Sequence, residues 1–349
     1  MELLEAETDE RRWLRLWRAC GSEPFAHPAY GRLFAQASER VAALVVDRPG
    51  GVALLPLIIR RVQDGLYDAT SPYGYGGPFF STGDGSASVL DAVSQWAGRE
   101  GLCSLFLRLS LGRETSSRPE VTQASDNVVV DLRREPEALW RNYEHKVRKN
   151  VNKALRAGCT VSRFELLDDL DGFLEIFSAT MRRRDAAAWY HFDRAFFARL
   201  AGDLAGSYST FAVRDRNHRM VSVEIVLESE KYLYSFLGGT LAEAFSMSPN
   251  DLLKHEIVRH GQRTGRSGFV LGGGYRPDDG IFRYKRAFDP GGVHPFRVAK
   301  IIGDPCRYAE MVAARCPAEA PDPRGIGFFP AYRAGEPPWS RRGGHRSSR

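Results

Sequence analysis

The sequence predicts an α/β protein with mixed (α+β) sheets, built from two tandem units of the same element order. The length of 349 residues suits two domains rather than one, and 43% hydrophobic residues are enough for two buried cores. The same succession of two helices, an antiparallel meander, a helix and a short strand is read twice along the chain. A repeated unit of this kind is a better account of the pattern than one large domain.

Hydrophobic periodicity and turn residues place the elements of the first half. Residues 47–51, Asp-Arg-Pro-Gly-Gly, form a turn between two apolar strands. In chain order the expected elements are helices near 8–19 and 28–38, strands at 40–47 and 52–60, a helix at 84–99 and a strand at 102–109.

The second half repeats this order, with a turn at residues 215–218. Its expected elements are helices near 168–184 and 192–204, strands at 208–214, 219–228 and 232–237, a helix at 249–264 and a strand at 268–271. This is the order of a GNAT-like α/β unit, so two tandem GNAT-like domains are expected. We place them at 1–135 and 136–303, and expect 304–349 to hold a C-terminal helix and a basic, disordered tail.

A basic helix opens the second predicted domain, over residues 139–158. Its apolar stripe recurs every four positions, at Leu139, Tyr143, Val147, Val151 and Leu155. Five bases decorate its other faces: Lys146, Arg148, Lys149, Lys153 and Arg156. Glu144 is the one acidic residue in this stretch, so a role in binding an anion competes evenly with that of a solvated charged face.

Composition and charge limit the class of protein. The net charge is +6, which suits a polyanionic partner, although part of the excess lies in the tail. Five widely spaced cysteines with no CxxC pair argue against a zinc ribbon or a disulfide framework. No apolar run approaches the ~20 residues of a membrane span, and the acidic amino terminus differs from a secretory signal. We expect a soluble cytoplasmic protein without metal or cofactor.

Two motifs fail on geometry. His255 and His260 bracket a sequence similar to a zinc-protease helix, but their spacing of five places them about 140° apart around the helix. Residues 262–268 have the composition of a coenzyme A pyrophosphate loop. They follow a helix, however, whereas helix amides hold a pyrophosphate at a helix's beginning.

Three segments carry candidate chemistry. The first is the glycine-rich loop 71–80, in which Tyr73 and Tyr75 offer flat surfaces with a polar tip. We favour a substrate-facing loop over a structural crossing with packed aromatics.

The second segment is 179–192, where Arg182, Arg183 and Arg184 end a helix and Trp189 and Tyr190 follow. Arginine forks bind phosphates and an aromatic ring can stack on a base or sugar. Helix-terminal charge beside core aromatics explains the pattern equally well.

The third segment is 271–290, where a strand runs into glycines and then into a short helix. That helix carries Arg283, Tyr284, Lys285 and Arg286, and the chain has only seven lysines. A fixed ammonium such as that of Lys285 can stabilise the oxyanion that forms when an amine attacks an ester or thioester.

Together these segments resemble the Fem family of aminoacyl-tRNA-dependent transferases, within the GNAT superfamily. The resemblance covers roughly residues 25–300. It rests on the basic helix with Trp140 and Asn150, on Ser248-Pro-Asn-Asp-Leu-Leu-Lys-His-Glu-Ile, and on the closing Leu-Gly-Gly with Phe282-Arg-Tyr-Lys285.

What the resemblance implies is transfer of an amino acid from aminoacyl-tRNA to an amine. The family's aromatic–lysine pair would correspond to Tyr284, where phenylalanine is usual, and Lys285, which would stabilise the tetrahedral intermediate. We expect further tRNA contacts from Arg283, Arg286, Lys146, Arg148, Lys149 and Lys153. The expected acceptor-binding residues are Tyr73, Tyr75, Arg183, Tyr190 and Tyr234.

The function expected is therefore an aminoacyltransferase whose acceptor is a peptidoglycan precursor or a small-molecule amine such as an antibiotic intermediate. An acyl-CoA-dependent N-acyltransferase of the same fold and a non-catalytic RNA-binding module remain as alternatives.

Overall fold

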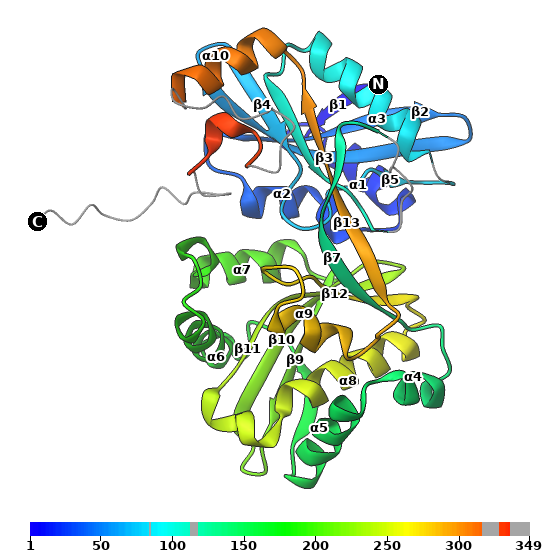
Figure 1. Ribbon diagram of the computed structural model, residues 1–349, viewed down its shortest axis with the longest axis vertical. Coiled ribbons are helices and arrows are strands. Elements are labelled where there is room, and N and C mark those ends of the chain that lie inside the picture. Colours follow the sequence, from blue (N-terminus) through cyan, green and yellow to red (C-terminus); the bar gives the residue numbers. More distant parts are fainter. Residues whose placement is uncertain (84, 112–117, 316–327, 336–349) are drawn as a thin grey trace, which may run out of the picture. The chain divides into compact units, whose positions relative to one another are not determined.

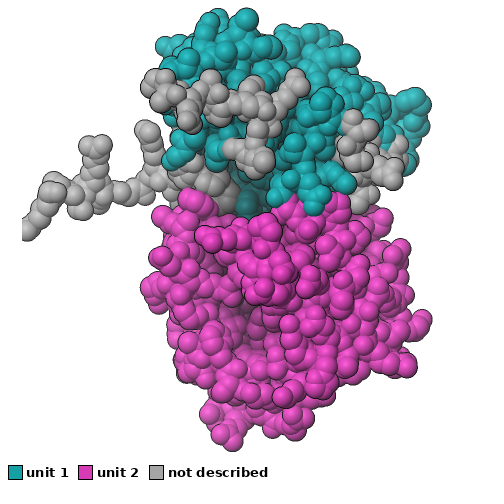
Figure 2. Space-filling model, viewed as in Figure 1, with its two compact units in different colours: residues 1–124, 297–349 teal, residues 125–296 magenta. Residues whose placement is uncertain are grey.

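The computed structural model describes residues 1–83, 85–111, 118–315 and 328–335. The chain forms two compact units (Figures 1 and 2). Unit 1 combines residues 1–124 with 297–349, and unit 2 comprises residues 125–296.

Unit 1 has a mixed sheet in the order β1-β2-β3-β4-β6-β13, in which β4 and β6 are parallel and the other neighbours are antiparallel. The short β5 pairs with β3. The elements are β1 (Glu2–Glu5), α1 (Glu10–Ala19), α2 (Pro28–Phe34), β2 (Arg40–Arg48), β3 (Gly51–Gln63), β4 (Leu66–Thr70), β5 (Phe79–Phe80), α3 (Ser86–Arg99), β6 (Ser104–Arg108), β13 (Val293–Ile302) and α10 (Pro305–Arg315), with short 3-10 turns at Pro24–Ala26 and Ala331–Arg333.

Unit 2 has the order β7-β12-β11-β10-β9-β8, and here β11 and β12 are the parallel pair. The elements are β7 (Val121–Asp131), α4 (Pro136–Asn142), α5 (His145–Arg156), β8 (Thr160–Phe164), α6 (Leu170–Arg183), α7 (Arg194–Asp203), β9 (Tyr208–Arg214), β10 (Met220–Glu228), β11 (Tyr232–Thr240), α8 (Pro249–Arg263), β12 (Gly268–Gly272) and α9 (Gly280–Arg286), with 3-10 turns at Ala188–Tyr190 and Ala242–Met247.

The strands of the two units follow the same order, so the predicted repeat is a repeat of topology. The last strand of each unit comes from the other half of the chain. β7 follows the elements of the first half but pairs with β12 of the second half. β13 follows the elements of the second half but pairs with β6 of the first half. The two consecutive domains expected from the sequence, with borders at 135 and 303, do not include this exchange of strands. The expected C-terminal helix is α10, which belongs to unit 1, and the expected tail from 336 on lies outside the described residues.

Each unit has an apolar core. In unit 1, α3 packs onto the sheet through Leu90 and Val93, both fully buried. In unit 2, stacked phenylalanines Phe173 and Phe177 of α6 lie against Phe197 of α7. Helices α5 and α8 lie side by side (Figure 1). On α5, Val147, Val151 and Ala154 are buried.

The single basic helix expected over 139–158 is wrong, because the chain breaks at Tyr143 and Glu144. Both residues have extended backbone, with ψ of 142° and 150°. The Arg148 guanidinium donates to the carbonyl oxygens of Arg141 and Tyr143, which satisfies the carbonyls at the end of α4. The stripe also ends early, since Leu155 is 53% exposed and Ala154 takes the buried position.

Candidate active site

A strand separation in unit 2 creates the candidate site. The parallel strands β11 and β12 pair through only three positions, from Tyr232 opposite Gly268 to Tyr234 opposite Val270. Beyond this point β11 continues to Thr240, and its register with β10 shifts at Ile225 and Val226. The carboxyl ends of parallel strands are where α/β proteins place their ligands.

Lys285 lies at this separation, on the short helix α9. Asp279 caps the start of α9, and its carboxylate accepts hydrogen bonds from the backbone N–H groups of Tyr275, Arg276 and Phe282. The partly buried ammonium of Lys285 donates to the carbonyl oxygen of Gly273, just after β12, at 2.7 Å. A capped helix and a hydrogen bond thus fix the position of the amine.

A buried ion pair lies near Lys285. Lys254 of α8 approaches Glu224 of β10 at 2.5 Å and donates to Ser235 of β11 at 2.8 Å. Lys254 and Glu224 are only 6% and 4% exposed. Charged groups at this depth are stable only when paired, and each of these has its partner.

The surroundings change the protonation of Lys285. Burial, and secondarily the positive charge of Lys254, lower the pKa of Lys285 to about 7, while Glu224 acts in the opposite direction. An amine with this pKa is close to half protonated at neutral pH. It can offer an ammonium to a developing oxyanion and can also exchange a proton near neutrality.

Tyr284, the neighbour of Lys285, is held by α8. Its hydroxyl accepts a hydrogen bond from Asn250 Nδ2 at 2.8 Å, and its ring packs edge-on against Phe288. Burial raises the pKa of Tyr284 well above its usual range, so the phenol stays neutral. The contact of Tyr284 with an RNA nucleotide stays a prediction.

Asp251, in the first turn of α8, adds a second perturbed group. Asn150 Nδ2 of α5 donates to its carboxylate at 3.2 Å. Burial raises the pKa of Asp251 to about 6, although the bond from Asn150 and the charge of Lys146 favour the ionised form. The carboxylate thereby links α5 to the helix that carries Asn250 and Lys254.

Two predicted acceptor residues, Arg183 and Tyr190, also lie in unit 2. The Arg183 guanidinium stacks over Phe245 at 4.8 Å, and Tyr190 packs beside Trp189. Tyr234 is different, because it is only 6% exposed. Side chains alternate between the two faces of a sheet along β11, so Tyr234 points to one face. Ser235, and Lys254 which contacts it, lie on the other face. The acceptor role of these three residues stays a prediction, and burial argues against it for Tyr234.

The other two predicted acceptor residues, Tyr73 and Tyr75, belong to unit 1. Tyr30 donates its hydroxyl to the carbonyl of Tyr73, and Tyr75 packs edge-on against Phe25. Burial raises the pKa of Tyr75 above its usual value. These contacts pack the loop within unit 1, and the acceptor-binding role of Tyr73 and Tyr75 stays a prediction.

Some of the predicted tRNA-contacting residues have partners within the protein, and others meet no carboxylate. Lys146 pairs with Glu144 at 3.4 Å, and Arg148 is bound to the carbonyls of α4. Arg283 and Arg286 both approach Asp278. By contrast, Lys149 and Lys153 are exposed and meet no carboxylate within the described part of the chain. The expectation that the bases of this helix are unpaired is thus met by only some of them.

Sequence reasoning gave no site role to Glu224, Lys254, Asp251 or Asn150, although the last three lie in the motifs that carry the resemblance. One signal was available: Glu224 stands in the apolar run Val-Ser-Val-Glu-Ile-Val-Leu, where a charged residue demands a buried partner. That this partner is Lys254 follows from the packing of α8 on the sheet.

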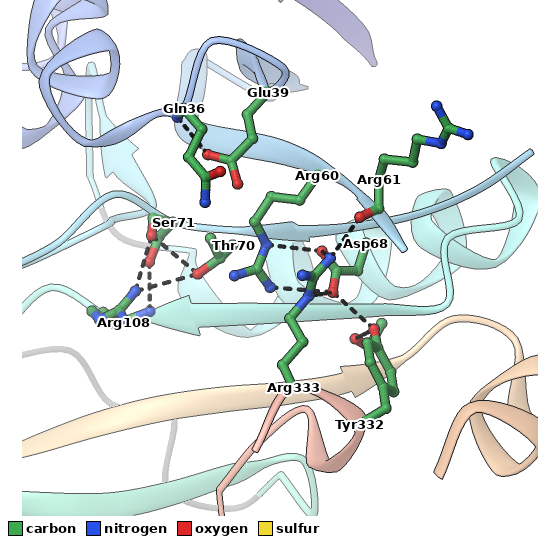
Figure 3. A network of polar contacts seen from close by, with 11 residues as sticks. Gln36, Glu39, Arg60, Arg61, Asp68, Thr70, Ser71, Arg108, Tyr332 and Arg333 are labelled. Carbon is green, nitrogen blue, oxygen red and sulfur yellow. Dashed lines mark hydrogen bonds and ion pairs between the residues drawn. The ribbon is translucent and has the colours of Figure 1, made fainter. Parts of the chain in front are cut away.

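The equivalent strand separation in unit 1 is filled by the protein itself. Strands β4 and β6 pair through only two positions, and Arg108 at the end of β6 donates to Thr70 Oγ1 and to the carbonyl of Ser71. Nearby, the fully buried Asp68 binds Arg60, Tyr332 and Arg333 (Figure 3). This second network fastens residues near the C-terminus to the sheet of unit 1.

Neither a metal cluster nor a membrane helix is found in the described segments. They hold no group of three His, Cys, Asp or Glu side chains suited to a metal ion. None of their helices has the length and apolarity to cross a bilayer.

A family model matches part of the chain, within unit 2. Residues 141–286 match the acetyltransferase (GNAT) domain family, over a range that begins in α4 and ends with α9. The range includes Lys285, Lys254 and Glu224. No curated protein matches the chain.

Solved structures extend the likeness to most of the chain. FemX is 14% identical, with 87% of this chain and 96% of FemX covered and a TM-score of 0.62. L-PGS from Bacillus licheniformis is 12% identical, with 86% of this chain and 94% of that chain covered and a TM-score of 0.57. The C-terminal domain of a putative lysylphosphatidylglycerol synthetase from Agrobacterium fabrum is 14% identical, with 88% of this chain and 96% of that chain covered and a TM-score of 0.54. The Fem-like, tandem GNAT-like fold predicted from sequence is confirmed as a fold.

Proposed function

We propose that the protein is an aminoacyltransferase that moves an amino acid from aminoacyl-tRNA to an amine and forms an amide. The observation that carries this proposal is Lys285, fixed where the parallel strands of a GNAT domain separate and beside a buried ion pair. The fold shared with FemX and the basic surface of α5 support the choice of an RNA-linked donor. Since charged tRNA is a cytoplasmic substrate, we place the reaction there.

In the proposed reaction the acceptor amine attacks the ester carbonyl carbon of the aminoacyl group. The carbonyl oxygen takes up negative charge, and the Lys285 ammonium stabilises it. The C–N bond forms, the C–O bond to the ribose breaks, and the proton lost by the amine passes to the departing ribose oxygen, directly or through water. Positioning and electrostatics supply most of the acceleration.

An acyl-CoA donor is the rival of the same fold, and the start of α8 argues against it. A pyrophosphate at a helix start needs free backbone amides. Here the first helical residue is Pro249, which has no N–H, and the Asp251 carboxylate lies in the first turn and accepts its own backbone N–H. A proline and a buried carboxylate in this first turn both disfavour a bound pyrophosphate.

The acceptor is an amine-bearing small molecule or peptidoglycan precursor. Arg183 and Tyr190 are the candidates in unit 2 for holding its phosphates. An antibiotic intermediate with a free amine fits the same chemistry.

The proposal is tested by the RNA dependence of transfer. The purified protein is given radiolabelled aminoacyl-tRNAs and a panel of amine acceptors, with and without RNase. We expect label to move only while the RNA is intact. Transfer from acyl-CoA and none from tRNA would replace the proposed donor, and RNA binding without any transfer would favour a binding module.

The role of Lys285 is tested in the same assay. We expect Lys285→Ala to lower kcat by about 10²–10³-fold, because the oxyanion loses its charged donor. Lys231→Ala is the matched control, since Lys231 is exposed and sits above Tyr232 away from Lys285. Circular dichroism of both variants checks that they are folded, and near-normal activity of Lys285→Ala would remove the assignment.

A further inference from the structure

We infer that the outer face of α5 binds the RNA body of the donor, at a surface separate from the reacting ester. This inference rests on the proposed function and names the surface that recognises its substrate. The surface is a shallow concavity, here called the α5 groove, lined by Trp140, His145, Arg148, Lys149, Asn152 and Arg156.

The α5 groove follows one side of a single helix. At about 100° per residue, positions 145, 148, 149, 152 and 156 fall within roughly 100° of arc. The opposite side of α5 carries Val147, Val151 and Ala154, which are buried against the rest of unit 2. The helix therefore presents its polar side chains as a continuous row about 16 Å long, at 1.5 Å of rise per residue.

The charges of the groove are free to meet an anion. Lys149 and Arg156 are exposed and have no carboxylate partner among the described residues. The guanidinium of Arg148 is held by two backbone carbonyls, which fix it in place without cancelling its charge. Glu144 pairs instead with Lys146, which lies off this face.

Trp140 gives the groove an aromatic surface at one end. Its ring contacts His255 at 5.0 Å and Tyr143 at 5.8 Å, and the side chain is partly exposed. A positive row with an aromatic platform is the combination by which proteins hold a nucleic-acid strand, with phosphates on the bases and a nucleobase stacked on the ring. A simple small anion needs no such platform.

The groove is coupled to the candidate active site through the inner side of α5. Asn150 donates a hydrogen bond to Asp251 of α8. The residue before Asp251, Asn250, donates to the hydroxyl of Tyr284, and Lys285 follows Tyr284 in the chain. The same helix thus touches the catalytic neighbourhood with one side and presents the groove with the other. We infer that RNA lying on the outer side brings its 3′ end toward Lys285.

Binding of uncharged tRNA to the full-length protein tests the inference without requiring catalysis. The groove variant is Lys149→Gln/Arg156→Gln. Its control is Lys231→Gln/Arg163→Gln, which removes one exposed lysine and one exposed arginine elsewhere in unit 2. We expect the groove variant to bind at least about 10-fold more weakly at 100 mM salt, and its slope of log K against log salt to be shallower by about 2. Trp140→Leu should weaken binding by roughly 5- to 100-fold with the salt slope unchanged.

Equal affinity and equal salt slope for the groove variant and its control would overturn the inference. A transfer assay separates this outcome from failure of the proposed function. The KM of the groove variant is compared with that of the wild type for two donors, aminoacyl-tRNA and an aminoacyl-trinucleotide. We expect the fold-increase in KM to be larger with aminoacyl-tRNA, by about 10-fold or more. No transfer from either donor in the wild type would defeat the proposed function, and the tRNA-binding comparison would still decide the role of the groove.

Discussion

Lys285 shows how position changes the chemistry of one side chain. Its amine is bonded to a backbone carbonyl, and it lies close enough to the Glu224–Lys254 pair for both charges to act on it. An exposed lysine stays protonated to about pH 10. Here the pKa is about 7, so the protonation state of the proposed catalytic group changes within the physiological range.

The pH dependence of transfer follows from this pKa. If the ammonium is the form that stabilises the oxyanion, kcat should fall as pH rises through about 7. In Lys285→Arg the guanidinium stays charged, so we expect this alkaline decline to disappear even though kcat is lower. The measurement is kcat from pH 6 to 9 for both proteins. A wild-type rate that rises through pH 7 would make Lys285 a base instead.

The two members of the buried pair should move this decline in opposite directions. Glu224→Gln removes a negative charge, lowers the pKa of Lys285 and moves the decline to lower pH. Lys254→Met removes a positive charge and moves it to higher pH. Each change breaks a buried pair and should cost about 3–5 kcal/mol of stability. Loss of stability alone would move the pH of the decline in kcat in the same direction in both variants. Shifts of that pH in the same direction would therefore contradict the electrostatic role.

At the scale of elements, the contact between α5 and α8 contains a carboxylate that is costly to ionise. Asp251 is 7% exposed, and Asn150 donates a hydrogen bond to it. Because its folded pKa of about 6 lies above the unfolded value, ionisation of Asp251 destabilises the fold. The cost is absent below about pH 4 and complete above about pH 6.

Asp251→Asn should remove that cost. We expect the variant to be about 1–3 kcal/mol more stable than the wild type at pH 7.5, with an advantage that shrinks as pH falls from 6 toward 4. Urea unfolding at pH 7.5, 6 and 5 measures the difference. A variant that is less stable at pH 7.5 would mean that the charged carboxylate has favourable partners that outweigh its burial.

At the scale of the whole molecule, the exchange of β7 and β13 makes each sheet depend on the other segment of the chain. β7 pairs with β12 and contributes Val128 and Val130, both fully buried. Losing them would cost about 1.5–3 kcal/mol for each side chain and would leave the edge of β12 unpaired.

This exchange predicts which fragments fold. Residues 121–296, which include β7, should give a soluble fragment that unfolds cooperatively. Residues 136–303, which lack β7 but include all of β13, should aggregate, because β12 is left as a bare edge. Gel filtration and urea unfolding of both fragments measure this. Equal behaviour would show that β7 is dispensable to the sheet of unit 2.

Local pattern in the sequence determined most of the elements and their repeat. Helix and strand periodicity depends on nearest neighbours along the chain, so the helices at α6, α7 and α8 and the strands of both meanders were anticipated within a few residues. The lysine of α9 and the basic α5 were also visible, because rare or unbalanced charges stand out in a sequence.

Tertiary structure alone decided the rest. β7 and β13 gain their pairing from strands distant in sequence, so no local pattern predicts which sheet each one joins. The break between α4 and α5 depends on Arg148 reaching back to two carbonyls. The pKa of Lys285, and the pairing of Glu224 with Lys254, arise only once β10, α8 and α9 are packed together, because desolvation and Coulomb interaction depend on distance in space.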